Sequence, residues 1–252
     1  MKIKVLGCFG SNTRGSQVTT FLINDTILLD AGCAASELTL KEQARIDTIL
    51  ISHAHLDHIA DIPFLCINRD LDQHLHIYTI PEVIGSLQLH ILNDDIWPDF
   101  TQIPSPEKAL MRFHPITPGR SFRVGDLKFL AVRVNHIVPT VGYFISDSKS
   151  TVLYTSDTGP TQEIWKKARE VRDLKAVILE VSFPNRMRKV AELSKHLTSE
   201  MMGQELEKLD GMDVPVYLYH AKPQHQAEIK REVGRLRGRP IAFLTQGKTY
   251  SL

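Results

Sequence analysis

The amino-acid sequence predicts an α/β protein, and three observations carry that prediction. Residues 174–181 form a continuous apolar run, which is typical of a strand buried on both faces. Residues 161–171 have the spacing of an amphipathic helix. Three ligand-type residues, His53, Asp157 and His220, each follow a short apolar run. Since loops beyond strand ends carry functional side chains in layered α/β folds, this placement predicts one site at the strand ends.

The first half of the chain is predicted to begin with strands. Lysines alternate with apolar residues over 2–6, and two apolar runs at 19–23 and 26–30 flank Asn24-Asp25, a hairpin signal. The elements expected after the hairpin are a helix at 36–44, a strand at 46–51, a helix at 59–67 with Pro63 in its first turns, a strand at 75–79 and a helix at 82–92 after Pro81. Residues 93–106 are expected to form a loop.

The second half is predicted to return to β structure from Pro115. Its expected strands are 122–124, 127–135, 141–146, 151–156, 174–181, 214–219 and 241–245. Its expected helices are 161–171, 199–209 with Thr198 or Ser199 as N-cap, and 224–235. Because we find neither a repeat nor a linker, residues 1–252 are expected to form one domain.

Composition disfavours several classes of partner. The chain has 252 residues, 42% of them hydrophobic, and 30 basic against 29 acidic residues leave a net charge of +1. Such a charge gives no general attraction to long nucleic acids or anionic membranes, so neither is expected as a stable partner. Three cysteines stand in apolar or small-residue contexts, as expected of buried thiols in a reducing compartment. Without a signal peptide or a membrane-spanning run, a cytoplasmic location is expected.

The densest group of ligand-type residues is Ser52-His53-Ala54-His55-Leu56-Asp57-His58, directly after an apolar run. In extended backbone, residues two apart point the same way, so His53 and His55 can bind one ion. Asp57 and His58 follow as the chain turns and are expected to point elsewhere, which suggests two metals. Neutral imidazoles and carboxylates suit Zn²⁺, Mn²⁺ or Fe, and the lack of nearby cysteine argues against a closed structural zinc site.

This His-x-His-x-Asp-His pattern resembles the signature of the metallo-β-lactamase superfamily. The resemblance implies a four-layer αββα sandwich with two divalent metals at one edge between the sheets. It also implies the ligand sets: His53, His55 and His136 for one ion, Asp57, His58 and His220 for the other, and Asp157 for both. Zn²⁺ is the first choice, with Mn²⁺ or Fe as alternatives. The true β-lactamases carry a cysteine where Asp157 stands, so that activity is not expected.

Further motifs narrow the resemblance. The chain is similar to the class II cyclic-nucleotide phosphodiesterases, which hydrolyse 3′,5′-cyclic AMP or GMP to the 5′-monophosphate. The similar stretches are His55-Leu56-Asp57-His58-Ile59, Ile96-Trp97-Pro98-Asp99-Phe100, Glu180-Val181-Ser182-Phe183-Pro184-Asn185, Lys195-His196-Leu197-Thr198 and His220-Ala221-Lys222-Pro223. The chain lacks the long insertions of the fungal members, and its loop at 11–16 is less glycine-rich than usual. The substrate is therefore left open within this class.

The expected chemistry follows from two ions. A water or hydroxide held between two metals is acidified and aimed at phosphorus, while the ions absorb charge on the phosphoryl oxygens. Asp57 could also orient or deprotonate that water. His196 completes neither metal set, so its protonated imidazole is expected to stabilise charge on the phosphate or to donate a proton to the departing oxygen. Glu180, at the end of a buried strand, could fix a histidine tautomer.

Substrate contacts are harder to predict. Trp97 and Phe100 could stack on a purine, although a structural corner is an equal alternative. Arg186 lies in a basic patch shortly before His196 and could contact phosphate, but a solvated surface is the more economical interpretation.

Three alternatives remain. A tRNA 3′-processing endonuclease resembles this chain in the implied metal set. Such enzymes, however, carry a protruding arm for tRNA between the third histidine ligand and the bridging aspartate. Here His136 and Asp157 are 21 positions apart, room for one hairpin. A thioesterase or lactonase would not need the His196 motif. A non-catalytic metal-binding module would predict gaps in the ligand set, and none is found. By the same resemblance, a homodimer is plausible.

Overall fold

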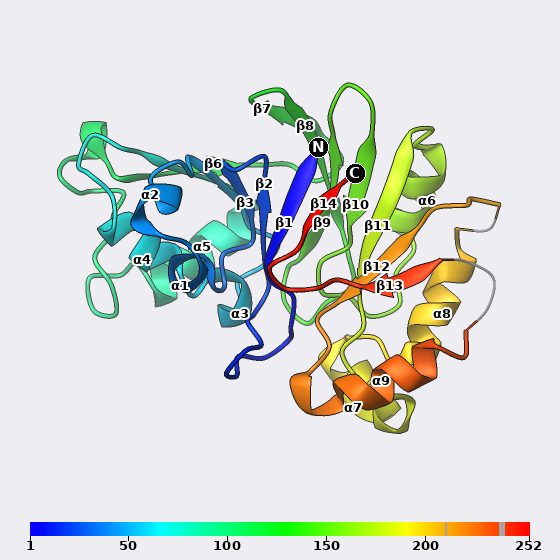
Figure 1. The fold of residues 1–252 in the computed structure, drawn as a ribbon. Coiled ribbons are helices and arrows are strands. Elements are labelled where there is room, and N and C mark those ends of the chain that lie inside the picture. Colours follow the sequence, from blue (N-terminus) through cyan, green and yellow to red (C-terminus); the bar gives the residue numbers. More distant parts are fainter. Residues whose placement is uncertain (210, 237–239) are drawn as a thin grey trace.

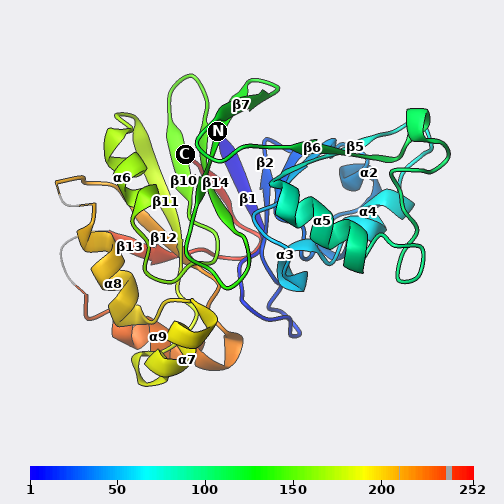
Figure 2. The ribbon, with the colours of Figure 1, turned by 180° about the vertical axis from the view of Figure 1, so that it is seen from behind.

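Two β-sheets lie face to face and helices cover their outer faces (Figure 1). This computed structural model describes residues 1–209, 211–236 and 240–252. The helices beside the first sheet are α1 (Ala34–Glu37), α2 (Leu40–Gln43), α3 (Leu56–Ile59), α4 (Ile62–Ile67) and α5 (Pro81–His90). Those beside the second sheet are α6 (Glu163–Glu170), α7 (Arg188–Ser194), α8 (Ser199–Glu207) and α9 (Gln226–Val233), as the view from behind also shows (Figure 2). The expected four-layer αββα architecture is confirmed.

The first sheet has the strand order β14-β1-β2-β3-β4-β5-β6. Its strands are β1 (Lys2–Gly7), β2 (Thr20–Ile23), β3 (Ile27–Leu29), β4 (Thr48–Leu50), β5 (Leu75–Thr79), β6 (Met111–Pro115) and β14 (Thr249–Ser251). Asn24 and Asp25 connect β2 to β3 with φ angles of 47° and 64°, as the hairpin prediction requires. From β3 to β6 the pairing is parallel, so these strands end at one edge of the sheet.

The second sheet has the order β13-β12-β11-β10-β9-β8-β7. Its strands are β7 (Ser121–Val124), β8 (Leu127–Arg133), β9 (Val141–Ser146), β10 (Thr151–Tyr154), β11 (Leu174–Glu180), β12 (Val216–Tyr219) and β13 (Ile241–Phe243). The strands β10 to β13 pair in parallel. All of β11 except Lys175 is buried, which confirms the interpretation of that apolar run.

Two hydrophobic clusters hold the layers together. One lies mainly between the sheets and includes Ile49 and Ile77 from the first sheet and Phe129 and Ile145 from the second. The other packs the second sheet against its helices and includes the fully buried Trp165. Burial of apolar area on this scale is the main favourable contribution to folding. The two sheets are therefore fixed relative to each other by shared core residues.

The structure adds three elements and corrects two expected helices. Strand β6, helix α7 and strand β14 were not predicted, because β6 carries alternating polar residues at a sheet edge and β14 is only three residues long. Strand β14 forms because it pairs with β1. The helix expected at 36–44 is two short helices, since Thr39 begins α2 with a capping box to Glu42. The helix expected at 59–67 begins earlier, as α3, so Asp57 lies on a helix.

In the described part of the chain, every helix is too short or too polar to cross a membrane.

Candidate metal centre

The ends of strands from both sheets bring the candidate ligands together. His53 and His55 follow β4 of the first sheet, and His136 follows β8 of the second. Asp157 follows β10 and His220 follows β12. Because parallel strands end at a common edge, residues more than 150 positions apart meet between the two sheets. The ligand atoms of these residues, with Asp57 and His58 of α3, form two neighbouring groups.

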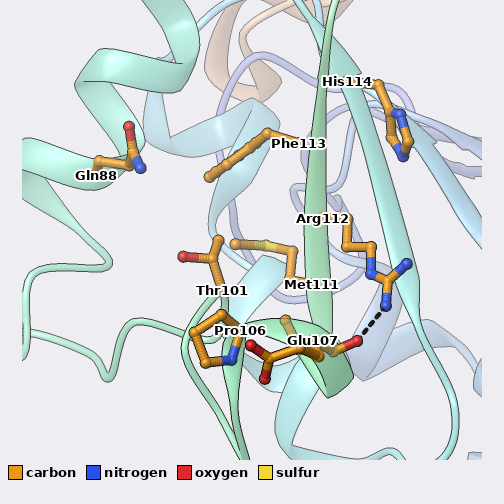
Figure 3. A pocket seen from close by; sticks show the side chains of 9 residues that line it. Gln88, Thr101, Pro106, Glu107, Met111, Arg112, Phe113 and His114 are labelled. Atoms are coloured by element: carbon orange, nitrogen blue, oxygen red, sulfur yellow. Dashed lines mark hydrogen bonds between the residues drawn. The ribbon is translucent and has the colours of Figure 1, made fainter.

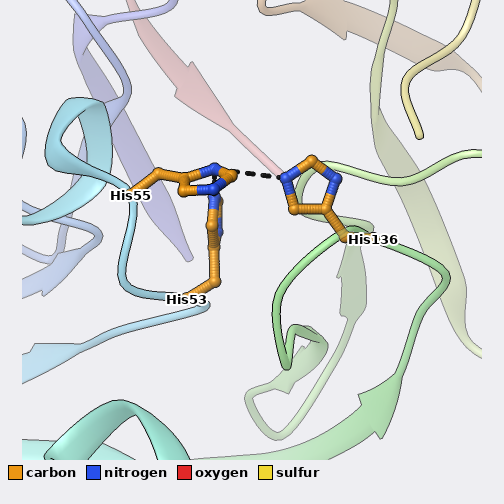
Figure 4. Close-up of side chains that lie close together, drawn as sticks. All are labelled: His53, His55 and His136. Carbon is orange, nitrogen blue, oxygen red and sulfur yellow. Dashed lines mark hydrogen bonds between the residues drawn. The ribbon is translucent and has the colours of Figure 1, made fainter. Parts of the chain in front are cut away.

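The first group consists of His53, His55 and His136, whose rings point toward one another in Figure 4. Nε2 of His53 lies 3.1 Å from Nδ1 of His55, and Nε2 of His136 lies 3.2 Å from that same Nδ1. Bonds of about 2.0–2.1 Å from one ion to two nitrogens at a tetrahedral angle place those nitrogens roughly 3.3 Å apart. The three imidazoles are therefore spaced to share one ion.

The second group consists of Asp57, His58, Asp157 and His220. Nε2 of His220 lies 3.2 Å from Oδ2 of Asp57 and 3.2 Å from Oδ2 of Asp157. Nε2 of His58 lies 3.3 Å from that same Asp157 oxygen, and Nε2 of His53, from the first group, lies 3.7 Å from it. The Asp157 carboxylate thus stands between the two groups.

Two buried atoms of this centre have no hydrogen bond. Within the described residues, Nε2 of His58 and Oδ2 of Asp157 are both buried without a hydrogen-bond partner. An unpartnered buried carboxylate oxygen is costly, and here three imidazole nitrogens surround it within 4 Å. A divalent cation between these atoms would satisfy them together. The residues therefore fit a metal centre.

Protonation suits metal binding at four candidate ligands, whereas the carboxylates of Asp157 and Asp30 outweigh burial and raise the pKa of His58 above its ordinary value. Burial lowers the pKa of His53, and it lowers the pKa of His136 to about 4, so both imidazoles are neutral near pH 7. Burial alone would raise the pKa of Asp157, but His220 and His58 beside it lower that pKa well below its usual range. Burial alone would also raise the pKa of Asp57, but the hydrogen bond from His220 and the charges of His58 and His220 together lower it. Neutral imidazoles and ionised carboxylates are the forms that bind metals.

A buried carboxylate that sequence reasoning missed supports the centre from behind. Oδ2 of Asp30 lies 2.7 Å from Nδ1 of His58, and Tyr154 donates its hydroxyl to the same oxygen at 2.7 Å. The backbone N–H and hydroxyl of Ser52 donate to the two Asp30 oxygens at 2.8 Å. Asp30 fixes the ring of His58 so that its Nε2 faces the ligand group. The available signal was an aspartate placed directly after the apolar strand β3.

Two other ligands are oriented by hydrogen bonds at their second ring nitrogen. Nδ1 of His136 lies 3.0 Å from the backbone carbonyl oxygen of Lys195, and Nδ1 of His220 lies 2.9 Å from the Ser182 hydroxyl. Each contact leaves Nε2 facing the centre, which is the arrangement that histidine ligands usually have.

His196 lies beside the centre and is paired with Glu180. Nδ1 of His196 is 2.7 Å from Oε1 of Glu180, and the ring stacks on that of His220 at 5.2 Å between centroids. Glu180 is itself held by the Thr158 N–H at 3.0 Å and the Ser182 hydroxyl at 2.8 Å. Burial alone would lower the pKa of His196, but the Glu180 carboxylate raises it above its ordinary value. Glu180 therefore stands where an orienting carboxylate was expected, with His196 as its partner.

The three residues expected to contact substrate lie in different environments. Phe100 is only 4% exposed and belongs to the core between the sheets, so its ring has no free face for a purine and the structure assigns it to packing. The half-buried Trp97 contacts the ring of Phe64 edge-on at 5.2 Å. The exposed guanidinium of Arg186 pairs with Glu228 at 3.1 Å. Roles of Trp97 and Arg186 toward substrate stay predictions.

A separate cavity of about 550 Å³ lies beside β6 and α5 (Figure 3). Its lining includes Met111, Phe113 and His114, and the guanidinium of Arg112 donates to the backbone oxygen of Glu107 at 2.7 Å. The residues of the two ligand groups are not among those that line it. The cavity is therefore distinct from the candidate metal centre.

Curated relatives of this chain include two proteins named as phosphodiesterases. The chain is 30% identical over 206 residues to a probable 3′,5′-cyclic-nucleotide phosphodiesterase of Yersinia pestis, a match that covers 72% of this chain and 58% of that protein. It is 27% identical over 260 residues to a 3′,5′-cyclic-nucleotide phosphodiesterase of Aliivibrio fischeri, covering 82% of this chain and 77% of that protein. A ribonuclease Z of Methanopyrus kandleri is 23% identical over 227 residues, covering 82% and 73%.

Solved structures share the fold at lower identity. Unliganded yeast PDE1 superposes with a TM-score of 0.82 at 18% identity, covering 98% of each chain. The metallo-β-lactamase fold protein YhfI of Bacillus subtilis superposes with a TM-score of 0.79 at 19% identity, covering 99% of each chain. The model of the β-lactamase superfamily domain matches residues 25–221, which include the candidate ligands from His53 to His220. With its αββα sandwich and its histidine–aspartate centre, this chain belongs to the metallo-β-lactamase superfamily of hydrolases.

Proposed function

We propose that this protein is a phosphodiesterase with two divalent metals that hydrolyses 3′,5′-cyclic nucleotides, cyclic AMP or cyclic GMP, to 5′-monophosphates. The position of Asp157 between two groups of ligands carries the proposal, because a shared carboxylate is what a two-metal centre needs. The names of the two phosphodiesterase relatives support the choice of substrate. This chain spans only 58% of the length of the first of these relatives. The activity is therefore a proposal for this chain.

The proposed ligand sets follow the two groups. His53, His55 and His136 would hold one ion, Asp57, His58 and His220 the other, and Asp157 both. The donor set of imidazoles and carboxylates favours Zn²⁺, with Mn²⁺ or Fe as alternatives. Two such ions supply an acidified water and absorb charge on the phosphoryl oxygens.

The residues of the chain supply orientation and proton transfer. Asp57 is ionised and 26% exposed in its side chain, so its carboxylate can accept a hydrogen bond from the attacking water and hold it in line with phosphorus. His196, held through Nδ1 by Glu180, has Nε2 left to donate a proton to the departing O3′. Its raised pKa keeps that proton available near pH 7. Asp57 and His196 are therefore the proposed catalytic residues.

RNA 3′-end processing is the second candidate, since a ribonuclease Z is among the relatives. Between His136 and Asp157 the chain forms only the hairpin of β9 and β10, whose strands pair from Tyr143↔Tyr154 to Ser146↔Thr151. This short connection leaves no protruding arm there for a long polyanion, and the net charge of +1 gives no general attraction to one. A small diester is therefore the better match.

We also infer that residues 1–252 act as one hydrolase domain, and we propose a homodimer as its assembly. The core between the sheets supports the first inference, because residues from Ile3 to Leu244 contribute to it.

Hydrolysis of cyclic AMP tests the proposal. Protein loaded with Mn²⁺ or Zn²⁺ is incubated with cyclic AMP or cyclic GMP, and 5′-AMP is separated from 3′-AMP. Chelated protein and the Asp157→Ala variant serve as blanks. Metal-dependent formation of the 5′-monophosphate supports the proposal. Protein that holds two ions but turns over neither nucleotide would contradict it, and RNA 3′ ends would be the next substrates.

A further inference from the structure

Gly10, in the first loop of the chain, lies directly against the candidate ligand His220. A Cβ atom at position 10 would stand 2.6 Å from the backbone oxygen of His220 and 2.8 Å from its Nδ1. Real Cβ atoms do not approach backbone that closely, so a larger residue at position 10 forces His220 to move. The loop and the ligand are 210 positions apart in the sequence, and the fold places them in contact.

The backbone of His220 is held in an unfavourable conformation by the same loop. Its φ of 69° lies in the left-handed region, which is unfavourable for a residue with a side chain and persists only where the surroundings enforce it. The N–H of His220 donates to the Cys8 oxygen at 2.7 Å, and the N–H of Gly10 donates to the Ala221 oxygen at 3.3 Å. The Lys222 ammonium donates to the Gly10 oxygen. These contacts clamp the segment that carries His220.

Gly32 has the same relation to Asp57. A Cβ atom at position 32 would stand 2.2 Å from the backbone oxygen of Asp57. The next residue toward the N-terminus, Ala31, donates its N–H to the His58 oxygen at 2.7 Å. A glycine shortly after strand β3 therefore lets the start of helix α3 approach the backbone at position 32 closely.

Both glycines act on one ligand group. Asp57 and His220 belong to the group that also contains His58. For the glycines that the structure describes, the three nearest atoms that a Cβ would meet never belong to His53, His55 or His136. Close approach of a glycine backbone therefore positions the group that contains Asp57 and His220, and not the group of His53, His55 and His136.

We propose that Gly10 and Gly32 are positioning residues that set the affinity of the ion held by Asp57, His58 and His220, without setting that of its neighbour. This inference rests on the proposed two-metal centre. Alanine at either position displaces one ligand of that ion by a few tenths of an ångström or more, whereas the three histidines of the first group are not among the nearest atoms that the added Cβ would meet. The fold thus offers a way to empty one metal position alone.

Metal stoichiometry tests the proposal. Wild-type protein, Gly10→Ala, Gly32→Ala and Gly85→Ala are stripped with chelator and titrated with Zn²⁺ in equilibrium dialysis. Gly85 is the matched control, because it lies inside α5 with open space around its Cβ position. Wild type and Gly85→Ala are expected to bind two ions per chain. Gly10→Ala and Gly32→Ala are expected to keep one tight ion and to bind the second at least about 10-fold more weakly.

Co²⁺ in place of Zn²⁺ reports which position is lost, since its visible absorption depends on the ligands. The spectrum of each single-ion variant should match that of His220→Ala and differ from that of His55→Ala. Two ions at wild-type affinity in Gly10→Ala and Gly32→Ala would overturn the proposal, as would equal weakening of both ions. Wild-type protein that binds fewer than two ions would instead remove the two-metal centre itself.

A variant without added bulk covers the case in which the alanine variants fail to fold. Lys222→Met removes the donor to Gly10 and adds no atom near His220. It is expected to weaken the same ion and leave the other unchanged. Unchanged binding of both ions in Lys222→Met would then count against a role for the first loop.

Discussion

Oδ2 of Asp30 lies 2.7 Å from Nδ1 of His58, and both side chains are fully buried. Tyr154 and Ser52 donate to the same carboxylate, so its oxygens have the partners that a buried charge needs. The pair turns His58 toward Asp157, from which Nε2 of His58 is 3.3 Å distant. Asp30 thus controls a candidate ligand without being one.

Asp30→Asn should weaken metal binding while the protein still folds. The amide keeps the shape of the carboxylate but loses the charge that favours the correct His58 tautomer, and loss of such a partner costs about 10- to 100-fold in metal affinity. Zn²⁺ affinity measured by competition with a chelator checks this. Asp25→Asn, in the exposed hairpin turn, is the control. Equal affinities in the two variants would contradict the orienting role.

Asp157→Ala should lose at least one ion and nearly all turnover. Its Oδ2 lies within 3.7 Å of ring nitrogens from both ligand groups, so alanine removes the carboxylate between them. Metal content per chain and cyclic AMP hydrolysis are measured together. Asp126→Ala, in the exposed turn between β7 and β8, should behave as wild type. A variant at position 157 with two ions and full activity would overturn the assignment.

His196→Ala should keep both ions and slow turnover by about 10²- to 10⁴-fold, the usual contribution of a general acid. Its Nδ1 contacts Glu180, and neither proposed ligand set contains it, although its ring nitrogens also lie close to ligand atoms of His136 and Asp157. Metal analysis beside steady-state kinetics separates the two roles. Loss of an ion in His196→Ala would make His196 a ligand.

Glu180→Gln should move the alkaline limb of the pH–rate profile to lower pH. Glu180 raises the pKa of His196, and activity that needs the protonated imidazole falls as pH rises through that pKa. Removing the carboxylate charge lowers the pKa, so activity is lost earlier as pH rises. The dependence of kcat on pH for both proteins at saturating metal measures the shift. An alkaline limb at the same pH in both proteins would show that this limb does not report the deprotonation of His196.

Sequence reasoning reached the centre but not its supports. His53, His55, Asp57 and His58 stand in one short segment, which makes their spacing visible without a fold. Asp30 and Ser182 were missed because a carboxylate or hydroxyl acquires its role only when another chain segment packs against it. The same limit applies to Phe100, whose sequence neighbours do not reveal that it is buried.

The strands, too, divide into those that local sequence predicts and those that depend on tertiary contacts. Strands with strong apolar runs, such as β11, could be predicted from sequence because a run of apolar residues indicates burial on both faces. Strand β14, Thr249–Ser251, could not be, since it exists only through its pairing with β1. Edge strand β6 was missed for a different reason: Arg112 and Pro115 are exposed, so the strand has no apolar run in the sequence.

Stability should fall in alkaline solution because three thiols are buried. Burial raises the pKa of Cys8, Cys33 and Cys66 to about 12, whereas a thiol in an unfolded chain titrates near roughly 8.5. Above that pH the unfolded chain loses protons that the folded chain keeps, so each thiol lowers the free energy of unfolding by about 1.4 kcal/mol per pH unit. The stabilising contribution is complete below about pH 8.5 and is lost as pH rises toward 12.

Cys66→Ala isolates one of these contributions. The variant should be less stable than wild type at pH 7.5, because a fully buried side chain is truncated, yet lose less stability between pH 7.5 and pH 9.5. Urea unfolding of both proteins at the two pH values, in the same metal state, gives the difference of differences. The buried tyrosines, whose pKa values burial also raises, contribute equally to both proteins and cancel. Parallel loss of stability in wild type and Cys66→Ala would show that the thiol of Cys66 is not kept protonated by the fold.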